Sequence, residues 1–313
     1  MKRVAFMFPG QGSQDIGMGK SFYDAYPEIK EMYQEADDVL NLSLSDIMFN
    51  GPKETLTATQ NAQPALLLSS IAVHTLLLKS EVQPVMAVGH SLGEYSALVA
   101  AGAISLEDAV QLVATRGKLM EEAFPAGKGA MAAVLGLSEE KVEESLKSLE
   151  TEEIVDLANI NCPGQIVISG TKEGIDQASV ALKESGAKRV LPLNVSGPFH
   201  SRLMKAANEN FAEKLEATSI TDANIPVYAN VTASPVTEHD EIKELLIKQL
   251  YSPVRFEESI RNMIDKGVDA FVEVGNGKVL SGLVKKIDRK MLTFAIQDPE
   301  SMEKFISWYK EDA

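Results

Sequence analysis

The chain has 313 residues, of which 45% are hydrophobic, so it can bury a sizeable core in one large domain or in one domain that carries a smaller insertion. Its 30 basic and 45 acidic residues give a formal charge of −15, which argues against nucleic acid as a partner because a duplex binder needs a basic face. No apolar stretch is long and uninterrupted enough for a membrane helix, no secretory leader is evident and the single cysteine, Cys162, is typical of a reducing compartment, so we expect a cytoplasmic protein without a membrane partner.

Strand-like and helix-like segments alternate along most of the chain. The expected strands are Arg3–Phe8, Pro84–Val88, Ile225–Asn230, Asp269–Val274 and Met291–Ala295. The expected helices are Pro27–Leu40, Pro64–Lys79, Leu92–Ala101, Leu106–Glu122, Glu238–Leu250 and Phe256–Lys266. Ser105 and Asp108 form a capping-box-like start for the helix at 106. This alternation predicts an α/β fold built on a parallel sheet.

Between residues 126 and 195 the order of elements changes to β-α-β-β-α-β. The segments are strand Ala130–Leu135, helix Ser138–Leu149, strands Ile154–Asn161 and Gln165–Ser169, helix Lys172–Ser185 and strand Arg189–Leu193. A tight-turn sequence, Cys162–Gly164, joins the two middle strands. The series is that of a ferredoxin-like unit. We therefore predict a core formed by 1–125 and 196–313, with 126–195 inserted as a small domain.

The segment Gly89-His90-Ser91-Leu92-Gly93 places one serine between two glycines, after an apolar strand and before a helix. Such a strand-to-helix turn is tight, so its flanking residues must be small, and it displays the serine hydroxyl at the helix N-terminus. Unpaired backbone N–H groups there can stabilise an oxyanion. The pattern predicts that Ser91 is a nucleophile.

A serine nucleophile needs a general base, and the chain offers four histidines. His90 is the immediate neighbour of Ser91 and should point elsewhere, His74 lies inside an apolar helix, and His239 lies in an acidic, exposed helix start. His200 follows the irregular segment Ser196–Phe199, where the chain returns from the small domain, and is the best placed. More than a hundred residues follow it, unlike the terminal histidine of an α/β-hydrolase, and no motif supplies an acid. We expect a Ser-His dyad whose second imidazole nitrogen is held by another acceptor such as a backbone carbonyl.

Three further features bear on chemistry. The Gly-rich turn Pro9–Gln14 follows the first strand and could bring backbone N–H groups close to a ligand, but its spacing does not match a nucleotide-binding loop. Arg116 lies in a predicted helix, where an arginine is usually exposed. No Cys/His cluster has metal-ligand spacing, and Cys162 has no evident activating partner.

Five motifs in order make the chain resemble the malonyl-CoA:acyl carrier protein transacylases over nearly its whole length: Gly10–Gln14, Gly89–Ser96, Arg116, Asn161–Gln165 and Pro198–Ser201. The resemblance implies an α/β-hydrolase-like core with a ferredoxin-like insertion. It also implies transfer of a malonyl group from malonyl-CoA to the thiol of an acyl carrier protein in type II fatty acid synthesis, by double displacement without a metal or a permanently bound cofactor.

The resemblance also assigns roles to individual residues. Ser91 corresponds to the nucleophile and His200 to the base, with the backbone N–H groups of Gln11 and Leu92 as the oxyanion hole. Arg116 corresponds to the carboxylate-binding arginine, and Gln249 to the residue whose main-chain carbonyl orients the histidine. Phe199 stands where other members carry serine. Because carrier proteins are acidic, the basic residues expected to dock the carrier are Lys188, Arg189, Lys285, Lys286 and Arg289.

Two other functions remain open at this stage. A thioesterase or esterase could use the same serine turn, and would differ by rapid hydrolysis of its acyl-serine. A non-catalytic scaffold that binds carrier proteins could keep the fold, although the presence of both Ser91 and His200 argues against it. The residues do not distinguish a fatty acid carrier from a polyketide carrier.

Overall fold

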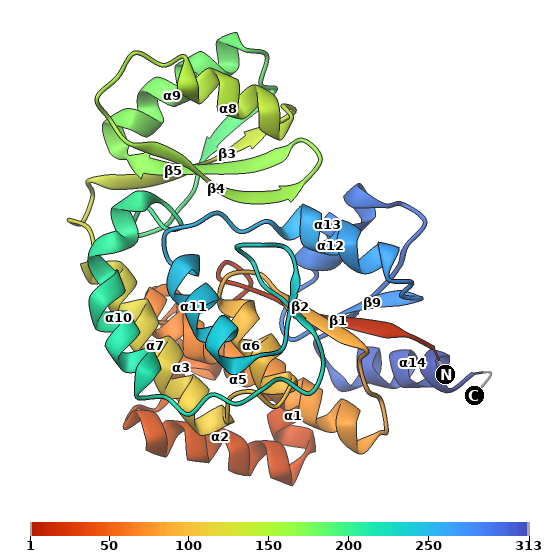
Figure 1. The fold of residues 1–313 in the computed structure, drawn as a ribbon. Coiled ribbons are helices and arrows are strands. Elements are labelled where there is room, and N and C mark those ends of the chain that lie inside the picture. The colour runs from red at the N-terminus through yellow and green to blue at the C-terminus, as the bar shows by residue number, and fades with distance from the viewer. Residues whose placement is uncertain (1, 312–313) are drawn as a thin grey trace.

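The computed structural model describes residues 2–311 and contains two sheets (Figure 1). The larger has the strand order β10-β9-β1-β2-β7-β8. Its strands are β1 (Val4–Phe8), β2 (Met86–Gly89), β7 (Val227–Tyr228), β8 (Pro235–Val236), β9 (Ala270–Val274) and β10 (Leu292–Ile296). All neighbouring pairs are parallel except β7 and β8, which form an antiparallel edge. The predicted parallel sheet is therefore confirmed, with an antiparallel strand added at one end.

The central strand β1 is buried along its whole length because both faces of the sheet are covered. Val4, Phe6 and Phe8 belong to the larger hydrophobic core on one face, whereas Ala5 and Met7 belong to a second core on the other. This division follows from the two-residue period of a strand, and explains why β1 reads as a continuous apolar run.

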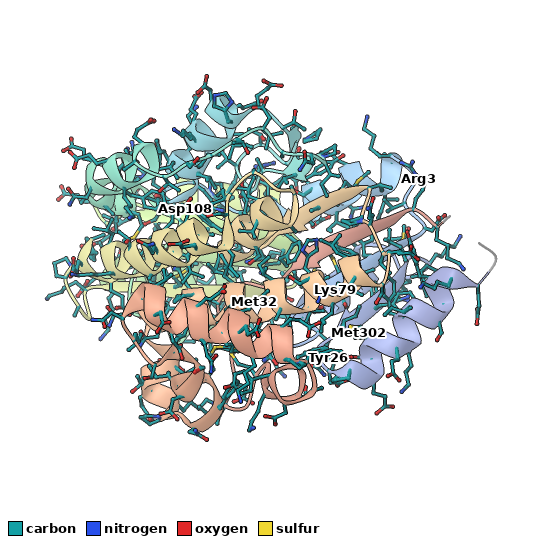
Figure 2. All side chains as sticks on the ribbon, turned by 90° about the horizontal axis from the view of Figure 1, so that it is seen from below. Arg3, Tyr26, Met32, Lys79, Asp108 and Met302 are labelled. Atoms are coloured by element: carbon teal, nitrogen blue, oxygen red, sulfur yellow. The ribbon has the colours of Figure 1, made fainter. Side chains whose placement is uncertain are left out.

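Helices cover both faces of this sheet. Those described are α1 (Lys20–Ala25), α2 (Pro27–Leu40), α3 (Leu44–Asn50), α4 (Lys53–Thr57), α5 (Thr59–Lys79), α6 (Leu92–Ala100), α7 (Leu106–Glu122), α10 (Asn208–Glu216), α11 (His239–Gln249), α12 (Phe256–Asp265), α13 (Val279–Ile287) and α14 (Pro299–Lys310), with a 3₁₀ turn at Arg202–Ala207. The long helix α5 could cross a membrane by length and composition alone, but 83% of its most apolar window is buried within the fold, as expected of a core helix. Figure 2 shows Lys79 at its end, where the Nζ atom lies 2.7 Å from the Glu28 carboxylate of α2.

The smaller sheet forms a separate unit with its own helices (Figure 1). It contains β3 (Gly129–Leu135), β4 (Val155–Cys162), β5 (Gln165–Thr171) and β6 (Arg189–Pro192), ordered β4-β5-β3-β6, with α8 (Glu139–Lys147) and α9 (Lys172–Glu184). All its strand pairs are antiparallel, and the β-α-β-β-α-β order matches the ferredoxin-like prediction. Ala132 and Ile168 pack under α8 and α9, whereas Met131 and Val167 belong to the core of the larger unit.

Backbone hydrogen bonds attach the small sheet to the large unit at β4. Ile160 donates to the carbonyl of Val254, and Val254 donates to Ala158, at 2.9 and 2.8 Å. The side chain of Arg202 pairs with Asp156 of β4 at 2.5 Å. These contacts bring β4 beside the segment that follows α11.

Several elements were not predicted. The missed helices are α1, α3, α4, α10, α13 and α14, and the missed strand is β8. Helix α5 begins at Thr59 and contains Pro64, whereas the sequence suggested a start at that proline. Helix α13 begins where the buried carboxylate of Glu273 accepts hydrogen bonds from the N–H groups of Leu280 and Ser281. The cap therefore comes from a neighbouring strand and leaves no local sequence signal.

Candidate active site

Ser91 lies in the turn between β2 and α6, with φ 52° and ψ −106°. A positive φ is unfavourable for a residue with a side chain, and such strain is concentrated at functional sites. The flanking glycines are required by packing, since a Cβ atom at Gly89 would lie 1.8 Å from the Gly93 carbonyl carbon. One at Gly93 would lie 2.0 Å from the carbonyl oxygen of Phe8. The turn thus presents the serine at the carboxyl end of the central strands.

His200 is the histidine that the fold brings to this serine. Its Nε2 lies 2.8 Å from Ser91 Oγ, and its Nδ1 lies 2.9 Å from the main-chain carbonyl oxygen of Gln249. Since that carbonyl can only accept, Nδ1 carries the proton and Nε2 is left as the acceptor for the serine hydroxyl. Burial, aided by the positive charge of Arg116, lowers the pKa of His200 to about 3. The imidazole is therefore neutral at neutral pH.

Gln11 and Leu92 both lie near the serine: Gln11 lines the same cavity as Ser91, and Leu92 follows Ser91 in the chain. Gln11 follows β1, and Leu92 is the first residue of α6. Within residues 2–311 neither backbone N–H donates to a carbonyl. Gln11, Ser91 and His200 line a cavity of about 300 Å³ together with Met131 and Phe199. Both N–H groups therefore lack a carbonyl partner among the described residues, as donors to an oxyanion must.

Arg116 is fully buried, so the exposed position expected of an arginine in this helix is wrong. Its Nη2 lies 3.2 Å from Ser91 Oγ and 2.9 Å from the side-chain oxygen of Gln249, and its Nη1 lies 2.9 Å from that of Gln63. The guanidinium also lies over the ring of Tyr95, 5.2 Å from its centroid. No carboxylate within residues 2–311 forms an ion pair with it. Because a buried cation without an ion-pair partner is costly, this position favours the binding of an anionic group beside the serine.

A buried polar network behind the serine was not predicted. One carboxylate oxygen of Glu94 accepts hydrogen bonds from the Asn230 backbone N–H at 3.0 Å and from the Gln249 side-chain amide at 2.8 Å. The Asn230 side chain accepts from the Ser91 N–H and donates to the Gly89 carbonyl. Burial raises the pKa of Glu94 to about 7. The sequence signal was the acidic residue that directly follows the serine motif.

The remaining histidines and the cysteine lie outside this contact. His90 Nε2 lies 2.8 Å from the Asn161 side chain, so it points away from the serine as expected. His74 packs against Phe6 and Phe8. Burial also raises the pKa of the Cys162 thiol. Within the described residues no cluster of His, Cys, Asp and Glu could hold a metal ion.

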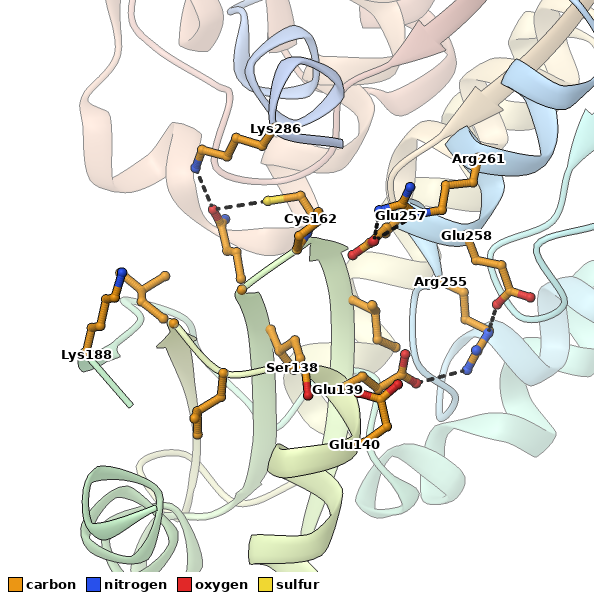
Figure 3. A pocket seen from close by; sticks show the side chains of 18 residues that line it. Ser138, Glu139, Glu140, Cys162, Lys188, Arg255, Glu257, Glu258, Arg261 and Lys286 are labelled. Atoms are coloured by element: carbon orange, nitrogen blue, oxygen red, sulfur yellow. Dashed lines mark hydrogen bonds and ion pairs between the residues drawn. The ribbon is translucent and has the colours of Figure 1, made fainter. Parts of the chain in front are cut away.

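A second groove, of about 870 Å³, lies where the β4–β5 turn of the small sheet faces α12 and α13 (Figure 3). Lys188 and Lys286 line one end, and Arg255 and Arg261 line the other. The arginines are paired with glutamates, whereas within residues 2–311 neither lysine has a carboxylate within ion-pair distance. Among the described residues, Lys286 donates only to the neutral amide of Gln165, at 3.0 Å.

The other basic candidates lie outside the lining of this groove. Arg189 and Arg289 are exposed, and Lys285 donates to the main-chain carbonyl of Met291. The groove thus gathers two of the five basic residues singled out from the sequence.

The chain is similar to acyltransferases along its whole length. Residues 5–295 match the family described as acyl transferase domain. A malonyl CoA-acyl carrier protein transacylase of Bacillus subtilis is 56% identical over all of this chain and 99% of its own length. The crystal structure of an acyl carrier protein S-malonyltransferase from Vibrio cholerae has a TM-score of 0.95 and 42% identity, over 97% of this chain and 100% of that one. A solved complex of a type II PKS acyl-carrier protein with its malonyl-transacylase gives a TM-score of 0.95 and 41% identity, over 98% and 99%.

Proposed function

The chain belongs to the acyl transferase family, and from this we propose that it transfers a malonyl group from malonyl-CoA to an acyl carrier protein through a malonyl-Ser91 intermediate. The observation that carries the proposal is the 2.8 Å contact between Ser91 Oγ and His200 Nε2 beside a buried, unpaired guanidinium. The malonyl specificity agrees with the names of its full-length relatives.

In the first half-reaction His200 Nε2 accepts the Ser91 proton as Oγ attacks the thioester carbonyl carbon. The Gln249 carbonyl stabilises the imidazolium through its hydrogen bond from Nδ1. The free N–H groups of Gln11 and Leu92 would bind the developing oxyanion. When the carbon–sulfur bond breaks, the coenzyme A thiolate leaves with the proton from His200.

In the second half-reaction the phosphopantetheine thiol of the carrier gives its proton to His200 and attacks the malonyl-serine. The bond between the acyl carbon and Ser91 Oγ then breaks, and the serine recovers the proton. One acceptor nitrogen therefore serves both halves, which gives double-displacement kinetics.

Arg116 would select the malonyl group. Its Nη2 is 3.2 Å from the atom that carries the acyl group, so the guanidinium is within reach of the free carboxylate of a malonyl-serine. A planar guanidinium makes two parallel charge-assisted bonds with a carboxylate, which an acetyl group cannot supply.

Intact mass measurement with malonyl-CoA tests this proposal. The wild type should gain one malonyl group that persists in water and is released by carrier thiol, whereas Ser91→Ala should gain none. His200→Ala should slow both half-reactions by about 10²–10⁴-fold. A malonyl adduct on Ser91→Ala would overturn the assignment of the nucleophile, and rapid hydrolysis of the wild-type adduct would indicate a thioesterase.

Three further expectations belong to the proposal: where the carrier docks, how the chain divides into domains, and where the protein acts. The carrier, an acidic protein, would dock at Lys188, Arg189, Lys285, Lys286 and Arg289, and the centre of this docking surface would be the two unpaired lysines of the groove in Figure 3.

Residues 126–195 would form the inserted domain, because every strand of the small sheet lies between 129 and 192, with 1–125 and 196–313 as the core. The protein would act in the cytoplasm in fatty acid synthesis, in keeping with its one free cysteine. Met1 and residues 312–313 lie outside the described residues.

A further inference from the structure

The buried carboxylate of Glu94 lies at the centre of the network behind the serine, although it touches neither Ser91 Oγ nor His200 in any hydrogen bond. Both donors that reach it, the Asn230 N–H and the Gln249 amide, converge on the same oxygen, Oε2. Glu94 is only 2% exposed, so these two groups take the place of water. Hydrogen bonds therefore connect Glu94 to the site through Asn230 and Gln249.

The hydrogen bond to Glu94 fixes the orientation of the Gln249 side-chain amide. An amide presents a donor at one end and an acceptor at the other, and the carboxylate requires the donor end. Nε2 accordingly faces Glu94 at 2.8 Å, with further contacts to the Ser91 carbonyl at 3.0 Å and the Asn230 side chain at 3.2 Å. This leaves Oε1 facing Arg116 Nη2 at 2.9 Å. A rotated amide would set a donor against the guanidinium, which only donates.

We propose that Glu94 is a positioning residue for malonyl recognition: by accepting the Gln249 amide it fixes the acceptor that holds Arg116 beside the acyl group on Ser91. The proposal rests on the proposed role of Arg116. The Asn230 contact is a separate arm that supports the serine turn through the Ser91 N–H and the Gly89 carbonyl. Loss of the Asn230 arm should affect every acyl group alike. Loss of the Gln249 arm should in addition affect the acyl groups that use Arg116, because the Gln249 side chain also accepts from the guanidinium.

The test compares Glu94→Gln with Glu94→Asp. Glutamine keeps the length and offers an amide oxygen where both donors converge, but lacks the charge. Aspartate keeps the charge, but its carboxylate is one methylene too short to reach Gln249. The measured quantity is the ratio of kcat/KM for malonyl-CoA to that for acetyl-CoA, which cancels losses common to both substrates.

We expect Glu94→Gln to keep the wild-type ratio within about threefold and Glu94→Asp to lower it at least about tenfold. The matched control is Glu273→Asp, since Glu273 is also fully buried and accepts two backbone N–H groups but lies outside the network. That substitution should leave the ratio unchanged. A fall in Glu94→Gln as large as in Glu94→Asp, or no fall in either, would overturn the proposal.

The ratio of the wild type distinguishes a failure of the proposed function from a failure of the positioning role of Glu94. If the wild type shows no preference for malonyl-CoA, the proposed function fails. If the preference is present and lost in Arg116→Ala, but the two Glu94 variants do not differ, only the positioning role of Glu94 fails.

Discussion

Replacing Arg116 with alanine should abolish the preference for malonyl-CoA over acetyl-CoA. In the wild type the guanidinium is desolvated completely and has only neutral partners, Gln63, Gln249 and Ser91. Without a malonyl carboxylate this buried charge has no ion-pair partner, a condition that costs on the order of 2–4 kcal/mol. At about 1.4 kcal/mol per factor of ten, this energy corresponds to discrimination of roughly 30- to 1,000-fold.

The assay measures kcat/KM for transfer of malonyl and acetyl groups to carrier protein, with thermal denaturation to confirm folding. Malonyl transfer should fall by the factor given above, while acetyl transfer is kept or increased. Acetyl transfer has a second reason to persist, since the Arg116 charge lowers the pKa of His200 and its removal raises that pKa toward the ordinary value of 6.5. The acidic limb of the pH profile should therefore move to higher pH in the variant.

Arg116→Lys serves as the control that keeps a positive charge without the planar fork, and its selectivity should lie between the two proteins. An equal fall for both acyl groups in Arg116→Ala would refute the reasoning. Arg116 would then be a structural residue of α7, and selectivity would lie elsewhere.

Three further variants test other parts of the structure. Gly93→Ala should abolish malonylation and lower the Tm, because its Cβ would lie 2.0 Å from the Phe8 carbonyl oxygen, and unchanged values for both would show that the turn can relax. Glu94, whose pKa burial raises from 4.5 to about 7, holds its proton more tightly in the folded state, so its own contribution to stability should fall by about 3 kcal/mol as the pH rises from 4.5 to 7. Urea unfolding of the wild type and Glu94→Gln at both pH values should show that the wild type loses stability relative to the variant over this interval, and an unchanged difference would contradict the assignment. Lys286→Glu should raise the KM for carrier protein but not for malonyl-CoA, and the effect should be strongest at low salt. The control Lys304→Glu, on the distant helix α14, should change neither KM (Figure 1). An unaltered KM for carrier protein in Lys286→Glu at low salt would argue against the docking surface.

Local patterns carried much of the fold and part of the site. The strand–turn–helix setting of Ser91 and the order of elements in 126–195 follow from periodicity and turn residues, which act over short distances. The contact between Ser91 and His200 was favoured by the position of that histidine at the return from the insertion, although it spans 109 residues.

The network behind the serine depends on pairings that no local pattern specifies. Glu94 meets Gln249 across 155 residues of sequence and Asn230 across 136. The burial of Arg116, by contrast, had a sequence signal. Buried α7 residues such as Leu112, Val113 and Met120 stand four before, three before and four after it, so helical periodicity places Arg116 on the inward face. The charge of the side chain led to the opposite prediction.

Gln249 makes two separate contacts in the site, one through its main chain and one through its side chain. Its main-chain carbonyl holds His200, and every amino acid supplies that carbonyl, while its side chain holds Arg116. A substitution at this position can therefore change which acyl groups are accepted while the main-chain carbonyl still accepts the hydrogen bond from His200.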